Sequence, residues 1–300
     1  MRDFLIRRLI RAVVVLWGIS TIVFVVMRLS GDPVTLLLPP DATQADHDRI
    51  SHQLGLDQPL WTQYAIFLAN VTHLDFGDSI HMRQPAFQVA MERLPATLEL
   101  AAAAFVLAVV IAIPIGVFSA MKPYGAFDNV AMLFALIGQS APTFFIGIML
   151  ILIMSLRVGW FPTGGRSDFS SVVLPAITLG AYAMASIARL TRSSMLEVIR
   201  RDYIRTARAK GLTEMVIVAR HALRNAAIPV VTIMGIQLGA LLGGSVVTET
   251  VFSWPGIGRL AIQSIFNRDY SVVQATVFMT ACWFVAINLA VDMIYGFLDP

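Results

Sequence analysis

The sequence contains few charged residues for its length. Only 14% of its 300 residues are Asp, Glu, Lys or Arg, whereas 57% are hydrophobic, and the mean hydropathy is +0.74. A soluble core of this size cannot bury so large an apolar fraction. The composition therefore excludes an ordinary soluble domain and indicates a chain whose solvent is largely lipid.

Cysteine is almost absent as well. Cys282 is the single cysteine and lies in an apolar run, so the chain can form neither a disulfide framework nor a cysteine metal site. We expect Cys282 to serve in packing, and we predict no metal site. The basic residues give a pI near 9.3, but they do not form one contiguous tract, which argues against nucleic acid as a partner.

The sequence also lacks the motifs of an enzyme. No Gly-x-x-x-x-Gly-Lys-Ser/Thr phosphate loop occurs, so the chain cannot hydrolyse ATP by that route. We find no nucleophile with a base and no paired acids on facing apolar segments, and we predict no catalytic residues. Glu99, Glu249 and Asp292 lie within about two turns of the ends of apolar segments, which argues against an ion-coupled carrier with charges at the membrane midplane.

Long apolar runs are what the sequence does have. A helix needs roughly 20 mainly apolar residues to cross a bilayer, and the stretches that meet this length are 9–29, 97–121, 129–156, 172–190, 228–248 and 272–297. Because no strand pattern stands out, we predict an all-α, polytopic membrane protein with six transmembrane helices. Lys and Arg concentrate at the N-terminus and between the fourth and fifth runs, so the positive-inside rule places both termini in the cytosol.

Two long connections divide the chain. Residues 30–95 mix turn signals such as Gly31-Asp32-Pro33 with helix-like stretches at 42–54 and 60–70, and we expect an external helical cap there. The predicted organisation is a cytosolic N-terminus and first span at 1–29, the cap at 30–95, and a five-span core at 96–300. This core includes a cytosolic loop at 191–227.

Small, polar and proline residues interrupt the apolar runs. Pro114 and Gly116 lie in the second run, and residues 138–142 break the third. Such breaks free backbone groups at membrane depth and often line a pathway. Small residues can also serve only close helix packing, which we expect for Gly235, Gly239, Gly243 and Gly244. Possible residues of a translocation path are Gln139, Ser140, Pro142, Gln237 and Asn288.

The loop at 191–227 contains a basic amphipathic stretch. One face carries Leu196, Ile199, Tyr203, Ala207 and Gly211 at helical spacing, and the other carries Arg201, Arg205 and Arg208. We predict one helix that ends at Gly211, a residue suited to a left-handed cap, and a short second helix at 214–225. The resulting knob could dock on a partner protein, rest on anionic lipid or only set the topology, and the pattern alone does not decide among these.

Specific stretches of the chain resemble a known family. Residues Asp202-Tyr203-Ile204-Arg205-Thr206-Ala207-Arg208-Ala209-Lys210-Gly211, with 221–226 and Pro229, resemble the signature loop of permease subunits of bacterial ABC importers. The match is to the branch that transports dipeptides, oligopeptides and nickel. Further matching stretches cover nearly the whole chain: Ser30-Gly31-Asp32-Pro33, Leu54-Gly55-Leu56-Asp57-Gln58-Pro59-Leu60, Asp75-Phe76-Gly77, Phe252-Ser253-Trp254-Pro255-Gly256-Ile257-Gly258 and Arg268-Asp269-Tyr270.

The loop departs from the general importer signature, which reads Glu-Ala-Ala, three residues, Gly, nine residues, then Ile-x-Leu-Pro. Ala207, Gly211 and Leu223 fit this signature, whereas Arg205, Thr206, His221 and Arg224 stand where Glu, Ala, Ile and Pro are expected. A contact made by the signature glutamate therefore cannot be carried over to Arg205. The ATPase-coupling residues that the resemblance implies are Tyr203, Arg205, Thr206, Ala207, Ala209, Lys210, Gly211 and Leu223.

The same resemblance implies a function and its partners. The chain would form half of the pore of an ATP-driven importer for peptides, or for a related small solute such as nickel or a metal chelate, in a bacterial inner membrane. Its implied partners are a second related permease, two ATPase subunits, an external solute-binding protein and membrane lipid. ATP and Mg would bind the ATPases, and this chain would bind no cofactor. The alternative is a secondary transporter or channel without ATP coupling, and a homodimer remains open beside a heterodimer.

Two external features have simple interpretations. Trp254, beside Pro255, fits an external elbow or an interfacial aromatic anchor, and we expect the anchor. Imidazole is a good nickel ligand, but the external histidines do not have the spacing of a helical metal site, so we expect surface histidines at His47, His52, His73 and His81.

Overall fold

The computed structural model describes residues 2–29, 43–53 and 56–298, with the backbone alone at 2–5, 50, 53 and 294–298. Throughout these residues the regular structure is helical, apart from one isolated bridge between Asp78 and Pro85. The prediction of an all-α chain is confirmed. The predicted turn at 31–33 and the pair Leu54-Gly55 lie outside the described residues.

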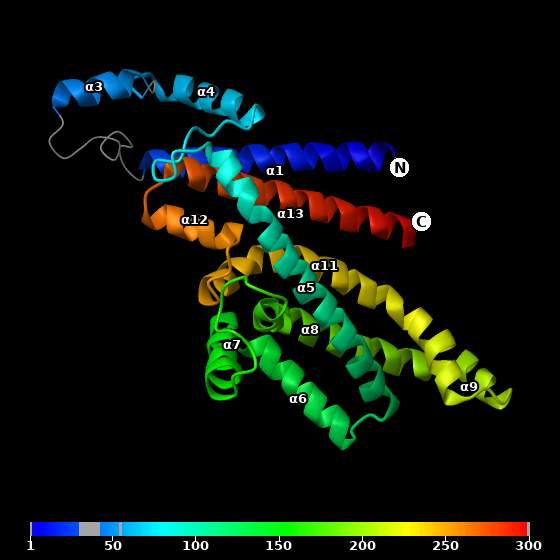
Figure 1. The fold of residues 1–300 in the computed structure, drawn as a ribbon. Helices are drawn as coiled ribbons and strands as arrows, with labels where there is room; N and C mark the ends of the chain where they lie inside the picture. Colours follow the sequence, from blue (N-terminus) through cyan, green and yellow to red (C-terminus); the bar gives the residue numbers. More distant parts are fainter. Residues whose placement is uncertain (1, 30–42, 54–55, 299–300) are drawn as a thin grey trace. The chain divides into compact units, whose positions relative to one another are not determined.

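Figure 1 shows the helices, coloured along the chain. In chain order they are α1 (Arg2–Leu29), α3 (Gln44–Gln53), α4 (Leu60–Thr72), α5 (Ala86–Met121), α6 (Ala126–Ser140), α7 (Thr143–Leu150), the π-helical η1 (Ile151–Arg157), α8 (Ser170–Ile199), α9 (Asp202–Ala209), α10 (Glu214–Val216), the π-helical η2 (Ile217–Ala222), α11 (Leu223–Val251), α12 (Ile257–Phe266) and α13 (Tyr270–Leu298). Helix α5 begins at Ala86 and therefore runs through the predicted domain boundary at 95 and 96.

Five helices within the described residues are long and apolar enough to cross a membrane, and a sixth span is possible if one bent pair counts as a span. The bent pair is α6 with α7 and η1, and its two parts meet at 114°. The predicted third span at 129–156 is broken within residues 138–142, the stretch that the sequence indicated as its interruption. Its break has a local cause, because proline disfavours helical backbone in the residue before it, and Ala141, before Pro142, is extended with φ −75° and ψ 135°.

The chain divides into two units, and the first comprises residues 1–95 and 256–285. Within it, α4 packs on α1 through aromatic rings. The Phe24 ring centroid lies 5.3 Å from that of Tyr64 and 5.4 Å from that of Phe67. The hydroxyl oxygens of Thr21 and Tyr64 are 2.6 Å apart and share a hydrogen bond.

The same unit brings together two stretches that carry the family resemblance. The Ser79 hydroxyl, just after Asp75-Phe76-Gly77, donates a 2.5 Å hydrogen bond to the buried carboxylate of Asp269, in the Arg268-Asp269-Tyr270 stretch. The Phe76 ring lies 5.4 Å from the ring of Phe278 in α13. These contacts fix the connection between α4 and α5 against the start of α13.

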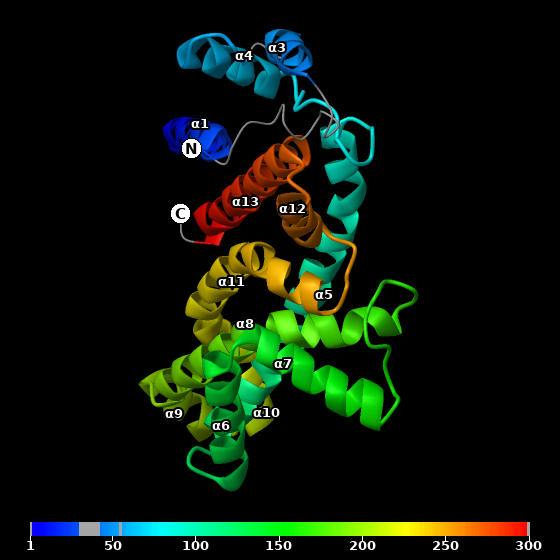
Figure 2. The ribbon, with the colours of Figure 1, turned by 90° about the vertical axis from the view of Figure 1, so that its left-hand side faces the viewer.

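The second unit, residues 96–255 and 286–300, is organised around α8, which packs against α11, α6 and α7. Both views in Figures 1 and 2 show α11 crossing α8. Small residues permit the close approach of α5 to α8. A Cβ atom at Gly116 would lie 2.7 Å from the Ala188 carbonyl oxygen, and one at Gly180 would lie 2.9 Å from that of Ala104. At these two positions the packing interpretation of the glycines holds.

Replacing Gly116 by alanine is expected to destabilise the protein by about 1–3 kcal/mol, because the added methyl group overpacks the crossing of α5 and α8. The matched control is Gly243→Ala in α11, where a Cβ atom meets nothing within 4 Å. That change should be neutral or stabilising by up to about 1 kcal/mol, since alanine favours the helix. Thermal unfolding of the purified protein measures both, and equal midpoints for the two variants would contradict the close crossing.

The end of α11 is buried rather than interfacial. Trp254 is fully buried, and its indole N–H donates a 2.8 Å hydrogen bond to the Ala96 carbonyl oxygen. In the turn before, the buried Glu249 carboxylate accepts a 2.7 Å hydrogen bond from the Thr97 hydroxyl. The expectation that Trp254 is an aromatic anchor is therefore wrong, because its indole N–H finds a protein acceptor in the core instead of the membrane surface.

Candidate functional site

The knob, defined as residues 200–213 with α9 at its centre, follows a break at the end of α8. Helix α8 ends at Ile199, and Arg201 has extended backbone angles (φ −70°, ψ 148°) that interrupt the helix. Helix α9 then begins at Asp202, whose carboxylate is favoured in a first helical turn. The predicted single helix through 194–211 is therefore wrong, since two helices with different axes occupy this stretch.

The predicted end of this stretch at Gly211 is confirmed. Gly211 has φ +81°, the left-handed region that favours glycine. Its N–H donates to the Arg208 carbonyl at 2.9 Å, and the Leu212 N–H donates to the Ala207 carbonyl at 3.3 Å. These two bonds form the Schellman pattern that satisfies the last carbonyls of a helix.

The break before α9 changes which side chains face inward. Ile204 and Ala207 are buried, whereas Tyr203, predicted on the same face as Ala207, is 43% exposed. The two buried residues belong to a cluster, here called the knob core: Ala120, Met195, Ile204, Ala207, Ile217, Val218, Ala222 and Ala226. Ala207 therefore packs inside the chain itself, and Leu223 is a partly buried residue against the same cluster.

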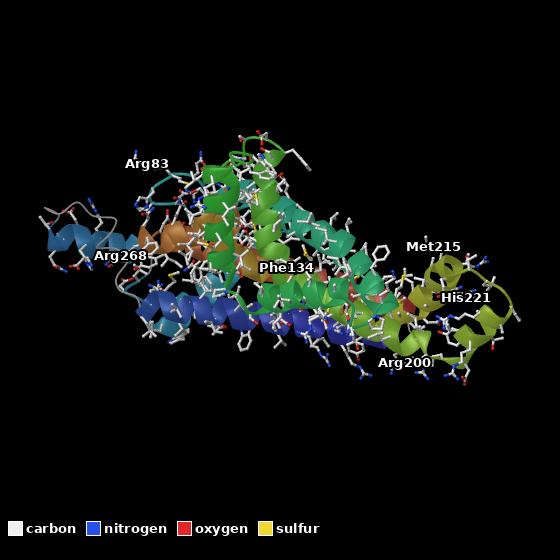
Figure 3. All side chains as sticks on the ribbon, turned by 90° about the horizontal axis from the view of Figure 1, so that it is seen from below. Arg83, Phe134, Arg200, Met215, His221 and Arg268 are labelled. Carbon is white, nitrogen blue, oxygen red and sulfur yellow. The ribbon has the colours of Figure 1, made fainter. Side chains whose placement is uncertain are left out.

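The outward surface of the knob is polar and basic. Its exposed predicted residues are Tyr203, Arg205, Thr206, Ala209, Lys210 and Gly211. The Arg208 guanidinium donates hydrogen bonds of 2.7 and 3.2 Å to the Glu214 carboxylate, which raises the pKa of Arg208 and ties α9 to α10. Figure 3 shows Arg200, Met215 and His221 gathered at the same end of this unit.

The predicted short helix at 214–225 is not a separate element. Helices α10, η2 and α11 form one continuous helical segment, Glu214–Val251. The N-terminal end of this segment contributes residues to the knob core. The same segment then continues as a candidate membrane span. A displacement of α9 would reach this span through the turn at 210–213 and the ion pair between Arg208 and Glu214.

A buried ion pair that the sequence did not reveal joins the region before the knob to α6. The Arg192 guanidinium donates two hydrogen bonds, of 2.5 and 2.7 Å, to the two carboxylate oxygens of Asp128. The Tyr124 backbone N–H donates a third bond, of 2.7 Å, to the same carboxylate. Because Asp128 lies in the first turn of α6 and Arg192 near the end of α8, the pair couples these two helices.

The residues predicted for a translocation path lie on different helices. Gln139 and Ser140 end α6, and the Gln139 side-chain oxygen accepts a hydrogen bond from Arg189 of α8. Gln237 is buried in α11, and two residues further on Gly239 faces Asn288, whose side-chain oxygen lies 3.4 Å from a Cβ atom built on that glycine. The structure thus places Pro142 and Gln139 at a helix break, while their role in a path stays a prediction.

Metal ligation finds no support in the described part of the chain. No group of three or more His, Cys, Asp or Glu side chains that could hold a metal ion lies there. His81 lies near Asp269, with its Nδ1 atom 3.6 Å from the carboxylate. The histidines predicted to be external therefore form no such group within these residues.

Comparison with known proteins gives matches along the whole chain. Residues 112–300 match the family described as "Binding-protein-dependent transport system inner membrane component", and residues 1–101 match the one described as "Binding-prot-dependent transport system membrane comp, N-term". The two matches leave only ten positions between them unassigned, 102–111.

Individual relatives extend over the same length. The oligopeptide transport system permease protein AppB of Bacillus subtilis (strain 168) is 41% identical over 312 residues, covering 100% of this chain and 99% of that protein. The glutathione transport system permease protein GsiC of Escherichia coli (strain K12) is 42% identical over 301 residues, covering 100% and 98%. A chain of the MetNI methionine ABC transporter, solved in inward-facing conformations, superposes with a TM-score of 0.60 at 23% identity, over 71% of this chain and 97% of that chain.

Proposed function

Because the chain belongs to the binding-protein-dependent transport system inner membrane components, we propose that it translocates peptides as one half of the pore of an ATP-driven importer. The family places the chain in an inner membrane, in a complex with ATPase and solute-binding partners. Candidate spans on both sides of the knob agree with this assignment.

The observation that carries the coupling role is the knob with its exposed basic surface. Arg205 and Lys210 project from a helix whose buried side is held by the knob core. A surface of this kind, fixed to a membrane span through the continuous segment Glu214–Val251, can receive a displacement from a soluble partner and pass it to the membrane. We propose that this soluble partner is one of two ATPase subunits. ATP and Mg bind to these subunits and not to this chain.

The remaining partners complete the proposed assembly. A second, related permease supplies the other half of the pore and the second knob, and a solute-binding protein delivers substrate from outside. In this assembly the knob and both termini lie in the cytosol, as the concentration of Lys and Arg at the N-terminus and at 189–224 favours.

Peptides are the substrate class that the relatives favour. AppB is named for oligopeptide transport and GsiC for glutathione, itself a short peptide. Nickel remains an expectation from the resemblance alone. The chain's own contribution to selection would come from residues such as Gln139 and Gln237, whose amide side chains can pair with peptide groups.

The proposed function can be tested by reconstitution. The chain, purified with its permease, ATPase and binding-protein partners, is placed in vesicles, and uptake of a labelled dipeptide is measured. Uptake is expected only with ATP and the binding protein present. Unlabelled oligopeptide or nickel added in excess identifies the preferred class by competition.

The same vesicles distinguish the ATP-driven importer from a secondary transporter. A secondary transporter would take up the labelled dipeptide with this chain alone, driven by an ion gradient and without ATP. Such uptake would overturn the importer assignment. A complex that hydrolyses ATP in response to loaded binding protein, but not in response to a gradient, would support it.

A further inference from the structure

Helix α4 carries no charged residue between Leu60 and Thr72, although one side of it is exposed. Trp61 is 75% exposed and Leu60 65%, and Ala65 and Ala69 are exposed further along the helix. A helix that faces water normally carries charged or polar residues on its outer side. The exposed polar residues of α4, Asn70 and Thr72, lie at its C-terminal end, so the exposed side of its first two turns is poorly suited to water.

The neighbouring helix α3 shows the opposite pattern. It presents Asp46, Asp48 and Arg49 within ten residues, and the Arg49 guanidinium lies 3.1 Å from the Asp46 carboxylate. Both helices belong to the same unit and to the same predicted cap at 30–95. Their different charge indicates that they meet different solvents.

The contacts of α4 show which solvent it meets. Its inward side packs on Thr21 and Phe24 of α1, and α1 is a candidate membrane span over Ile6–Leu29. At the rise of an α-helix, Thr21 lies about 12 Å along the axis from the C-terminal end of that span. Since α1 exposes apolar residues such as Ile22 and Val25 at this level, α4 lies beside a surface that faces lipid.

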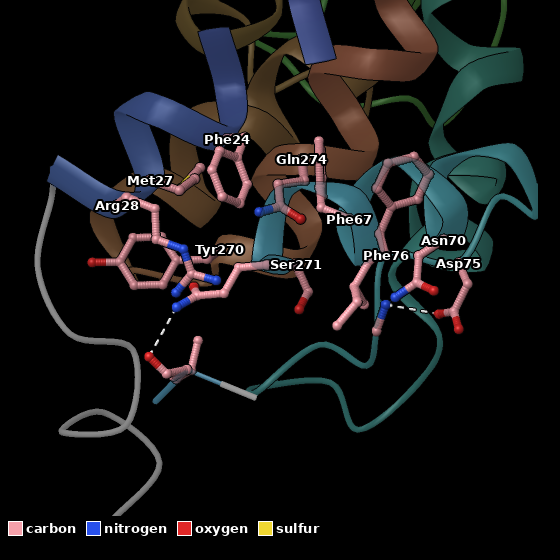
Figure 4. Close-up of a pocket in the computed structure, with 14 residues that line it drawn as sticks. Phe24, Met27, Arg28, Phe67, Asn70, Asp75, Phe76, Tyr270, Ser271 and Gln274 are labelled. Atoms are coloured by element: carbon pink, nitrogen blue, oxygen red, sulfur yellow. Dashed lines mark hydrogen bonds between the residues drawn. The ribbon is translucent and has the colours of Figure 1, made fainter. Parts of the chain in front are cut away.

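The inward side of α4 also borders a cavity of about 290 Å³. Figure 4 shows Phe24 and Arg28 of α1 and Tyr270 of α13 around it. Arg28 and Tyr270 lie at the ends of two candidate spans, and basic and aromatic residues are typical of the membrane–water interface. This places the level of α4 at the boundary between headgroups and acyl chains.

We propose that the outward side of α4 is a lipid-contacting surface, embedded in the membrane leaflet into which the C-terminal half of α1 extends. The occupant is lipid because the surface lacks charge and continues the exposed apolar side of α1. Helices with an apolar face bind at this boundary because the apolar area that they bury among the lipids stabilises them there. The segment 30–95 is then only partly a water-exposed cap, with α3 in water and α4 in the membrane.

Spin labels in the reconstituted complex test this surface. In a Cys282→Ser background, single cysteines replace Ala65 in α4, Ala45 in α3 as the water control, and Ile22 in α1 as the lipid control. Collisions of each label with oxygen, which enters lipid, and with a nickel chelate, which stays in water, are compared in lipid nanodiscs. The oxygen-to-nickel ratio at Ala65 is expected to match Ile22 and to exceed Ala45 by about tenfold, or about 1.4 kcal/mol of partitioning.

Two results at Ala65 would overturn the proposal. A ratio equal to that of Ala45 would show that the surface meets water, and low collision rates with both reagents would show that protein covers it. If Ile22 itself were reached by the nickel chelate, α1 would not face lipid at this level, and the proposed lipid surface would fail while the other candidate spans, and with them the permease function, would stand. A lipid signature at Ile22 with a water signature at Ala65 would remove this proposal alone.

Discussion

Replacing Arg192 by methionine is expected to lower the free energy of unfolding by about 2–4 kcal/mol. The change leaves the buried Asp128 carboxylate without the two hydrogen bonds that compensate its charge, and breaking a buried ion pair by removing one partner is strongly destabilising. We expect a loss toward the lower part of the range usual for broken buried ion pairs, because the Arg192 side chain keeps 20% of its surface exposed. Thermal or denaturant unfolding of the purified protein measures it.

Two controls separate the ion pair from the loss of any arginine. Arg189→Met, one turn earlier in α8, removes an exposed side chain that binds a neutral amide, and should cost less than about 1.5 kcal/mol. The double variant Asp128→Leu with Arg192→Met removes both charges and should recover part of the loss. Equal effects of Arg192→Met and Arg189→Met would show that the pair contributes nothing beyond a single exposed contact.

Replacing Gly211 by arginine is expected to abolish co-purification of the ATPase subunits and to lower ATP hydrolysis stimulated by the binding protein at least tenfold, which requires about 1.4 kcal/mol of lost binding. The new side chain would project from the exposed end of α9, where a Cβ atom meets nothing within 4 Å in the chain itself. It would therefore obstruct a partner without creating an internal clash. Membrane insertion should be unchanged.

The matched control addresses backbone strain at the same position. Gly211 has φ +81°, and a left-handed conformation costs most residues roughly 1–2 kcal/mol, whereas asparagine visits it readily. Gly211→Asn should retain the ATPase subunits if the arginine acts by obstruction. Full ATPase retention in Gly211→Arg would contradict docking at this surface, and loss in both variants would assign the effect to the cap of α9.

Local features of the sequence predicted the local features of the structure. Long apolar runs predicted the helices that can span a membrane, because length and apolar composition are properties of a single segment. Gly211 was predicted as a helix end because glycine adopts the left-handed backbone at the lowest cost. Pro142 indicated the interruption of the third run, although not the 114° bend that it produces.

The inward face of the knob could not be predicted because its helical phase is not continuous. Counting from Leu196 in steps of helical length selects Tyr203, but the extended backbone at Arg201 starts a new helix and brings Ile204 into the knob core instead. The break shifts the helical phase enough to turn Tyr203 outward, whereas Ala207 of the same predicted face stays in the knob core.

The sequence by itself determined that this is a helical membrane protein that resembles ABC importer permeases. Hydropathy and contiguous motifs are properties of single segments and do not depend on distant contacts. Only the tertiary structure decided that Asp128 meets Arg192, 64 positions away, that Trp254 is buried against the Ala96 carbonyl, and that α4 rests on α1. These contacts join residues far apart in the chain, and their partners depend on how whole helices pack. Packing of that kind follows from the summed shapes of many side chains rather than from any one segment.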